Sequence, residues 1–144
     1  MALYASKYWS CTEWDCFQRD SNEYAYDDEN GKLCTDNEQT ANLFKILDLL
    51  REWNPYWQIN TTNAGYKSGF RTPEVNDSVG GKPNSQHLYG CAADICISNE
   101  DDTDETLANT VLEAAKAYGL EDSLGIGYYG DWIHLDTRGE TARW

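Results

Sequence analysis

The first long periodic stretch of the chain predicts a helix. Apolar residues fall on one stripe at helical spacing, at Leu43, Leu47 and Leu50. The pattern Thr35-x-x-Glu38 is typical of a capping box, so we expect the helix to begin there. Asn54-Pro55 disfavours helical backbone and ends the helix after Trp53.

A second amphipathic stretch, residues 104–118, predicts another helix. Gly119 follows it and suits the left-handed conformation of a helix C-cap. The acidic run at residues 99–105 overlaps the start of this helix. Carboxylates there favour the helix dipole, whereas the run lacks the glycine and spacing of an EF-hand calcium loop. We therefore interpret it as a solvated helix start.

Short apolar runs between turn residues predict strands over residues 57–61, 91–97, 126–129 and 132–135. In the second run, Asp94 faces the side opposite to Ala93 and Ile95. Residues 80–84 read as a loop. Together the elements predict an α+β fold, a single small domain with an antiparallel sheet flanked by helices.

The first 35 residues show no clear period. They are aromatic and acidic, and they hold too many aromatic side chains for a disordered tail. We expect residues 1–35 to form an irregular segment packed on a domain of residues 36–144. The length of 144 residues suits one domain with its own core.

Charge and hydropathy exclude several kinds of partner. The net charge is −14, and only 11 Lys and Arg residues are spread along the chain, so nucleic acid is not expected. No apolar run approaches the ~20 residues of a membrane span, and the start is too short and too aromatic for a signal peptide. We expect a monomer that is made in the cytoplasm and acts after release from it.

The five cysteines do not predict a disulfide framework. Their number is odd and no secretion signal is recognised. Cys11, Cys16 and Cys34 could form a second zinc site, but a fourth ligand is missing. We interpret them, with Cys91 and Cys96, as buried free thiols.

Both histidines of the chain lie in motifs that suit a metal. His87 precedes Asp94 by seven residues, and His134 follows Asp131 by three. Two imidazoles and one carboxylate fill three tetrahedral zinc positions and leave the fourth for a water. His87, Asp94 and His134 are therefore the predicted zinc ligands.

Asp131 is the predicted general base, because its offset from His134 lets it reach a water without binding the metal. Asp136 shares a strand face with His134 and is the alternative. Asp136 could act as the base, or it could form a hydrogen bond to a metal ligand or an arginine without binding the metal itself.

Several segments resemble the M15 family of zinc peptidases in order and spacing. They are Ser68–Pro73 (S-G-F-R-T-P), Ser85-x-His87-x6-Asp94, Asp131-x-x-His134 and the ending from Gly125 to Trp144. The Val79–Leu88 segment is similar to the small phage-type branch, in which position 91 is usually polar or charged, here Cys91. The resemblance covers about residues 36–144. It implies a hedgehog or D-Ala-D-Ala peptidase-like fold and Zn²⁺ as cofactor.

Two further side chains are candidates for substrate binding. The Arg71 guanidinium could stabilise an oxyanion or hold a substrate carboxylate, and its alternative is an ion pair that supports the fold. Ser85 could bind substrate or cap its loop. Tyr128, Tyr129 and Trp132 could line the cleft, but aromatic residues in a small sheet more often pack in the core, so we interpret them as core and assign them no site role.

The resemblance implies a peptidase that hydrolyses peptidoglycan stem peptides with a metal-activated water. The bond is D-Ala-D-Ala, as in a carboxypeptidase, or L-Ala-D-Glu, as in a phage endolysin. The alternative is a zinc-containing cell-wall-binding or phage structural module without turnover.

Overall fold

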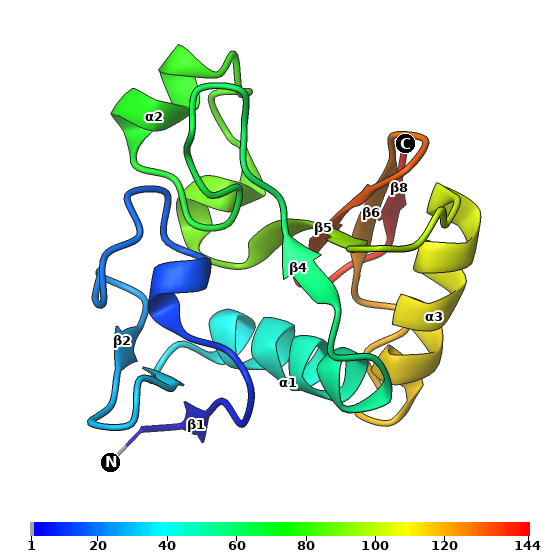
Figure 1. Cartoon of the computed structure of the whole chain (residues 1–144), viewed down its shortest axis with the longest axis horizontal. Coiled ribbons are helices and arrows are strands. Elements are labelled where there is room, and N and C mark those ends of the chain that lie inside the picture. Colours follow the sequence, from blue (N-terminus) through cyan, green and yellow to red (C-terminus); the bar gives the residue numbers. More distant parts are fainter. Residues whose placement is uncertain (1) are drawn as a thin grey trace.

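A five-stranded sheet forms the centre of the computed structural model, which describes residues 2–144 (Figure 1). Its order is β4-β5-β7-β6-β8. The strands are β4 (Trp57–Ile59), β5 (Ala92–Ile97), β6 (Gly125–Tyr128), β7 (Ile133–Asp136) and β8 (Ala142–Arg143). All neighbours are antiparallel except β8, which the sequence pattern did not predict and which runs parallel to β6. The α+β class is confirmed.

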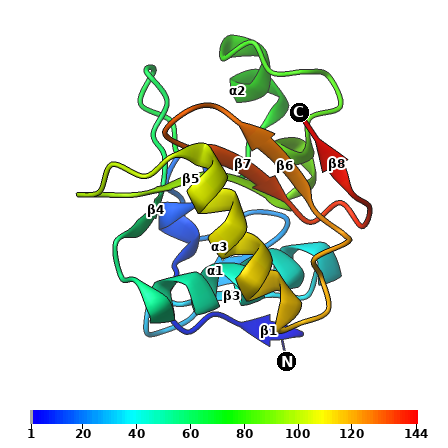
Figure 2. The same ribbon diagram turned by 90° about the vertical axis from the view of Figure 1, so that its right-hand side faces the viewer.

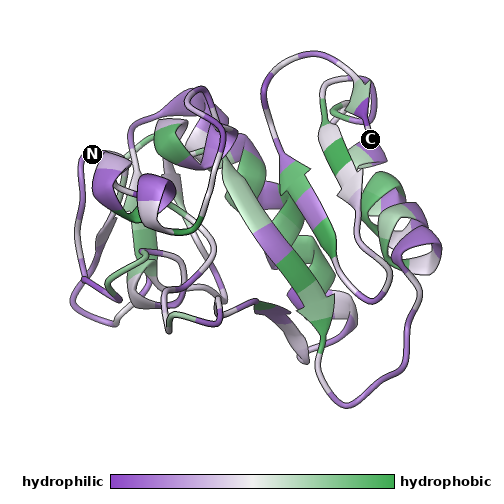
Figure 3. Cartoon of the chain, turned by 90° about the horizontal axis from the view of Figure 1, so that it is seen from above, coloured by the Kyte–Doolittle hydropathy of each residue, from purple (hydrophilic) through white to green (hydrophobic). Residues whose placement is uncertain are grey.

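Helices α1 (Glu38–Trp53) and α3 (Asp104–Lys116) pack together, and α3 lies across the sheet (Figure 2). Alternation along the strands divides the sheet into two faces. Ala93 and Ile95 of β5, with Ile133 and Leu135 of β7, join the helices in the hydrophobic core. Figure 3 shows the matching alternation of hydrophobic and hydrophilic segments along the strands. The other face is left for polar side chains.

The start of α1 differs from the capping-box prediction. The N-cap is Asn37, whose side chain accepts a hydrogen bond of 3.0 Å from the Thr40 backbone N–H. Thr35 cannot cap the helix because it is the last residue of strand β3 (Leu33–Thr35), and its hydroxyl donates to the Tyr24 carbonyl. The predicted end at Trp53 is confirmed.

A short helix, α2 (Pro73–Ser78), was missing from the prediction. It has only six residues, so no hydrophobic period could reveal it. Its local signals are a proline in the first turn and Thr72, whose side chain accepts from the Val75 backbone N–H. The helix leads into the loop before the first histidine.

The N-terminal segment is more regular than predicted. It contains β1 (Tyr4–Ala5), β2 (Tyr26–Asp27) and β3, which pair in the order β1-β3-β2, and a 3-10 helix, η1 (Cys11–Glu13). Trp9 and Trp14 are fully buried in the main core, and the Trp14 indole donates a 3.0 Å hydrogen bond to the Ala92 carbonyl. The segment therefore helps to build the core of the domain.

The five cysteines are free thiols, as predicted, and four of them are buried. Burial raises the pKa of Cys11 and of Cys91 to about 12, so both thiols are protonated at neutral pH. Within residues 2–144, none of the helices combines the length and apolar character needed to cross a bilayer.

Candidate metal centre

Asp94 and His134 lie directly opposite each other on neighbouring antiparallel strands. The register of β5 and β7 pairs the two residues, and both point away from the helices. One oxygen of the Asp94 carboxylate, Oδ1, lies 3.1 Å from His134 Nδ1. Two donors are thus positioned by neighbouring strands of the sheet, as directly paired strand residues have closely spaced side chains.

His87 reaches the same carboxylate oxygen from a loop. It lies on a short 3-10 helix, η2 (Gln86–Tyr89), which ends at Gly90 in the left-handed region with φ +68°. A Cβ at Gly90 would also lie 2.3 Å from the Tyr24 ring. The position therefore requires glycine both for its backbone conformation and for the space beside Tyr24. The His87 Nε2 atom lies 3.3 Å from Asp94 Oδ1.

The outer nitrogen of each imidazole is held by an acceptor. His87 Nδ1 lies 2.7 Å from the Gly69 carbonyl oxygen, and His134 Nε2 lies 2.7 Å from an oxygen of Asp136. A carbonyl accepts only, so His87 Nδ1 carries the proton. The ionised Asp136 likewise accepts a hydrogen bond from the N–H of His134 Nε2. In the neutral rings, the inner nitrogens therefore present lone pairs toward Asp94.

The electrostatics of the cluster call for a cation. Burial lowers the pKa of His87, so its ring is neutral at neutral pH. Burial alone would raise the pKa of Asp94, but His87 and His134 lower it well below its ordinary value. Burial acts to lower the pKa of His134, yet its bonds to Asp136 and Asp94 raise it overall. At His87, a buried lone pair thus faces a carboxylate oxygen with no proton between them, which is unfavourable without a positive ion.

These residues fit a zinc ion. His87, Asp94 and His134 each offer one donor atom, and the three atoms lie within 4.8 Å of one another. Donors at the vertices of a tetrahedral zinc site with bonds near 2.0–2.1 Å stand about 3.3 Å apart, close to the 3.1 and 3.3 Å measured here. Among residues 2–144 no other group of three such side chains comes together in this way.

Ser68 and Arg71 hold the second oxygen of Asp94. The Ser68 hydroxyl donates to Oδ2 at 2.5 Å, and the Arg71 guanidinium lies 3.5 Å from the same atom and 3.1 Å from the Ser68 oxygen. Burial lowers the pKa of Arg71, although the Asp94 charge opposes this. The S-G-F-R-T-P motif begins at Ser68, but the sequence predicted a role only for Arg71. Ser68 is buried and holds the Asp94 carboxylate in place.

Asp136 lies behind His134 and is fully engaged. Its two oxygens accept hydrogen bonds from the Arg138 side chain at 2.9 and 2.8 Å, and from His134. These partners outweigh burial and lower the pKa of Asp136. The geometry favours the ligand-holding role over the alternative of a general base, since no oxygen is left to take a proton.

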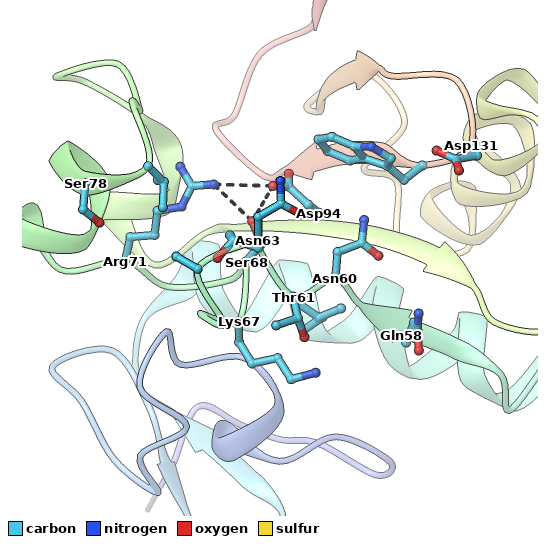
Figure 4. Close-up of a pocket in the computed structure, with 15 residues that line it drawn as sticks. Gln58, Asn60, Thr61, Asn63, Lys67, Ser68, Arg71, Ser78, Asp94 and Asp131 are labelled. Atoms are coloured by element: carbon cyan, nitrogen blue, oxygen red, sulfur yellow. Dashed lines mark hydrogen bonds and ion pairs between the residues drawn. The ribbon is translucent and has the colours of Figure 1, made fainter.

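Asp131 lies at the exposed rim, in the connection between β6 and β7. It lines the same cavity of about 850 Å³ as Asp94, Ser68 and Arg71. Figure 4 places its carboxylate at the far end of that cavity from Arg71, with Asp94 between them. The structure thus puts the two predicted catalytic residues in one cavity without bringing them into contact.

Ser85 acts as a cap. Its hydroxyl accepts a 3.3 Å hydrogen bond from the His87 backbone N–H at the start of η2. Ser85 also lines a second cavity of about 680 Å³, which Tyr129, Trp132 and Trp144 share. The interpretation of the aromatic residues as core is wrong for Tyr128 and Tyr129, which are exposed.

A histidine and carboxylate donor set on the floor of an open cleft is the arrangement of metal-dependent hydrolases, because it leaves space for a water and a substrate. Comparison with known proteins agrees. The family model described as Peptidase M15 matches residues 18–136. The chain therefore belongs to the M15 peptidase family and is by family a metallopeptidase, which confirms the resemblance.

One curated relative matches part of the chain. Over 75 residues, this chain is 35% identical to the zinc D-Ala-D-Ala carboxypeptidase of Streptomyces albus G. The match covers 52% of this chain and 27% of that protein, so the chain spans about a quarter of the relative's length. No solved structure matches the chain at a significant level.

Proposed function

We propose that the protein is a zinc-dependent peptidase that hydrolyses peptide bonds of peptidoglycan stem peptides. The observation that carries this proposal is the convergence of the inner nitrogens of His87 and His134 on one oxygen of Asp94. Family membership and the zinc carboxypeptidase relative support the choice of metal and of substrate.

His87, Asp94 and His134 would hold the ion. Zinc, when bound, polarises a substrate carbonyl and lowers the pKa of a bound water to about 7. The protein contributes a fixed ligand set. Gly69 and Asp136 keep both imidazoles in the ligating tautomer, and such outer partners strengthen metal binding.

Asp131 is the residue we assign to proton transfer. No side-chain hydrogen bond within residues 2–144 involves its carboxylate, whereas both oxygens of Asp136 are occupied. Asp131 is thus able to take a proton from the attacking water and pass it to the leaving amine.

We assign Arg71 to stabilising the negative charge that develops on the substrate carbonyl oxygen. Arg71 lines both cavities, so its guanidinium lies beside any substrate that extends from one cavity into the other over the metal ligands. A donor already in place stabilises developing negative charge on a carbonyl oxygen.

The cleft continues on both sides of the donors. The larger cavity and the smaller one share Arg71, Asp94 and Trp132, so substrate can extend in two directions from the ligand set. This favours an internal bond of the stem peptide over its last one.

Digestion of purified muropeptides by the zinc-loaded protein, with mass spectrometry of the products, tests the proposal. We expect one defined bond to be cut by the wild type, and no cleavage by a matched His134→Ala variant. Intact muropeptides after incubation with protein that holds one zinc per chain would instead support the alternative of a binding module without turnover.

A further inference from the structure

Three aromatic side chains border the donors without being buried. Tyr129 and Trp144 are 47% and 48% exposed, and with Trp132 they line the smaller cavity. Trp144 comes from the end of β8 and reaches His134, with 5.1 Å between ring centroids. Exposed aromatic groups at a cleft are typical of a binding surface, since folding alone would cover them.

The three rings are held in fixed positions. Tyr129 and Trp132 stack with centroids 4.2 Å apart and planes 6° from parallel. The Trp144 indole N–H donates a 2.9 Å hydrogen bond to the Tyr129 hydroxyl. Gly127 makes room for them, because a Cβ there would lie 2.6 Å from Trp144 and 2.8 Å from Tyr129. A rigid surface loses little entropy when it binds a ligand.

The rest of the smaller cavity is polar. The loop before His87 contributes Lys82, Asn84, Ser85 and Gln86, and Val79 is the single aliphatic residue in the lining that the structure describes. A pocket for an aliphatic side chain would be lined by several such residues. This cavity instead combines flat aromatic faces with amide, hydroxyl and ammonium groups, and so it suits a ligand that has both kinds of surface.

We propose that the smaller cavity is a sugar subsite, in which a pyranose ring of the peptidoglycan glycan strand stacks on Trp144 and its aromatic neighbours. The C–H face of a pyranose packs on an aromatic ring, while its hydroxyl and acetamido groups bond to side chains such as Asn84 and Gln86. This inference rests on the proposed peptidase function and adds a substrate class to it.

A sugar in this position has a consequence for the bond that is cut. The smaller cavity is lined by all three donors, His87, Asp94 and His134, so the sugar lies next to the ligand set and not one stem length away. The scissile bond then belongs to the glycan-proximal end of the stem, and the remainder of the peptide extends into the larger cavity.

Two substrates test the sugar subsite. One is a muropeptide that carries its disaccharide, and the other is the same stem peptide after the sugar has been removed. We expect the wild type to prefer the sugar-bearing substrate about tenfold in kcat/KM, the scale of one aromatic stack.

The variant to compare is Trp144→Ala, in which the ratio of the two kcat/KM values should fall toward one. Trp53→Ala is the matched control, because Trp53 is 50% exposed at the end of α1 and lines neither cavity. It should keep the wild-type ratio. Zinc content, measured in each variant, separates a lost sugar contact from a damaged ligand set near His134.

The outcomes separate the two proposals. Equal cleavage of both substrates by the wild type would overturn the sugar subsite and leave the peptidase intact. If neither substrate is cut, the peptidase proposal fails, and quenching of tryptophan fluorescence by the disaccharide then decides the subsite. Quenching that Trp144→Ala abolishes supports it, and absence of quenching rejects it.

Discussion

Asp48 and Asp94 are carboxylates of almost equal burial, 5% and 6% exposed, with opposite surroundings. Asp48, on α1, accepts hydrogen bonds from the Tyr4 and Ser6 hydroxyls and from two backbone N–H groups, those of Lys7 and Tyr8. Every neighbour supplies a proton, so the charge is satisfied within the chain. Asp48 attaches the N-terminal segment to the helix.

Asp94 is satisfied on one oxygen only. Ser68 and Arg71 serve Oδ2, while Oδ1 faces the inner nitrogens of His87 and His134. Burial of a carboxylate therefore does not by itself identify a functional site. What distinguishes Asp94 is that imidazole nitrogens face its Oδ1 atom, where Asp48 has only hydrogen-bond donors. A cation would satisfy both the carboxylate oxygen and the imidazole nitrogens.

The strongest test of this comparison is Asp94→Asn, which keeps the shape and removes the charge. We expect zinc per chain to fall far below one and activity to drop by about a thousandfold or more, since two imidazoles alone make a poor site. Elemental analysis and muropeptide digestion measure the two effects. A fully active Asp94→Asn protein would contradict the ligand assignment.

Asp48→Asn should lower the stability of the fold without changing zinc binding. Loss of the charge leaves buried hydroxyl and N–H groups poorly paired and should lower the free energy of unfolding by about 3 kcal/mol. Zinc content should stay at one per chain. Urea unfolding of both zinc-free variants gives the contrast, and equal stability of wild type and Asp48→Asn would remove the structural role.

Asp131→Asn extends the comparison to a carboxylate that lies at the exposed rim. We expect zinc and stability to be retained and kcat to fall about a hundredfold, the scale of general base loss. Asp136→Asn is the companion variant and should weaken zinc binding instead, because His134 loses its partner. If Asp136→Asn alone abolished turnover while zinc stayed bound, the two roles would be exchanged.

Arg71→Lys should have the smallest effect of these variants. Lysine keeps the charge but cannot contact Ser68 and Asn76 while facing the substrate, so kcat should fall about tenfold with zinc unchanged. Steady-state kinetics and melting temperature measure this. A large fall in melting temperature with unchanged activity per folded molecule would make Arg71 a support of the fold.

The sequence predicted what depends on local pattern. The period of Leu43, Leu47 and Leu50 gave the long helix. Alternation placed Asp94 opposite Ala93 and Ile95, and the strand register of the structure then pairs it with His134. The spacing of the donors was readable because the three residue types are chemically specific.

Features that depend on distant contacts were not readable. Thr35 and Asn37 are both good caps, and only the pairing of β3 decides between them. Ser68 is an ordinary serine until the fold brings it to Asp94. Tyr129 resembles a core residue by type, but it follows strand β6 and is 47% exposed.

The hydrogen bond from Trp14 to Ala92 joins positions 78 apart in the chain. Trp14 also pairs through its carbonyl with the Phe70 N–H, beside Arg71, and a Cβ at Gly69 would lie 2.2 Å from it. Contacts between such distant positions form slowly, because large loops must close first. The segment that contains Trp14 thus helps to complete the loop that carries Arg71, and we expect zinc capture during refolding to follow the formation of β5.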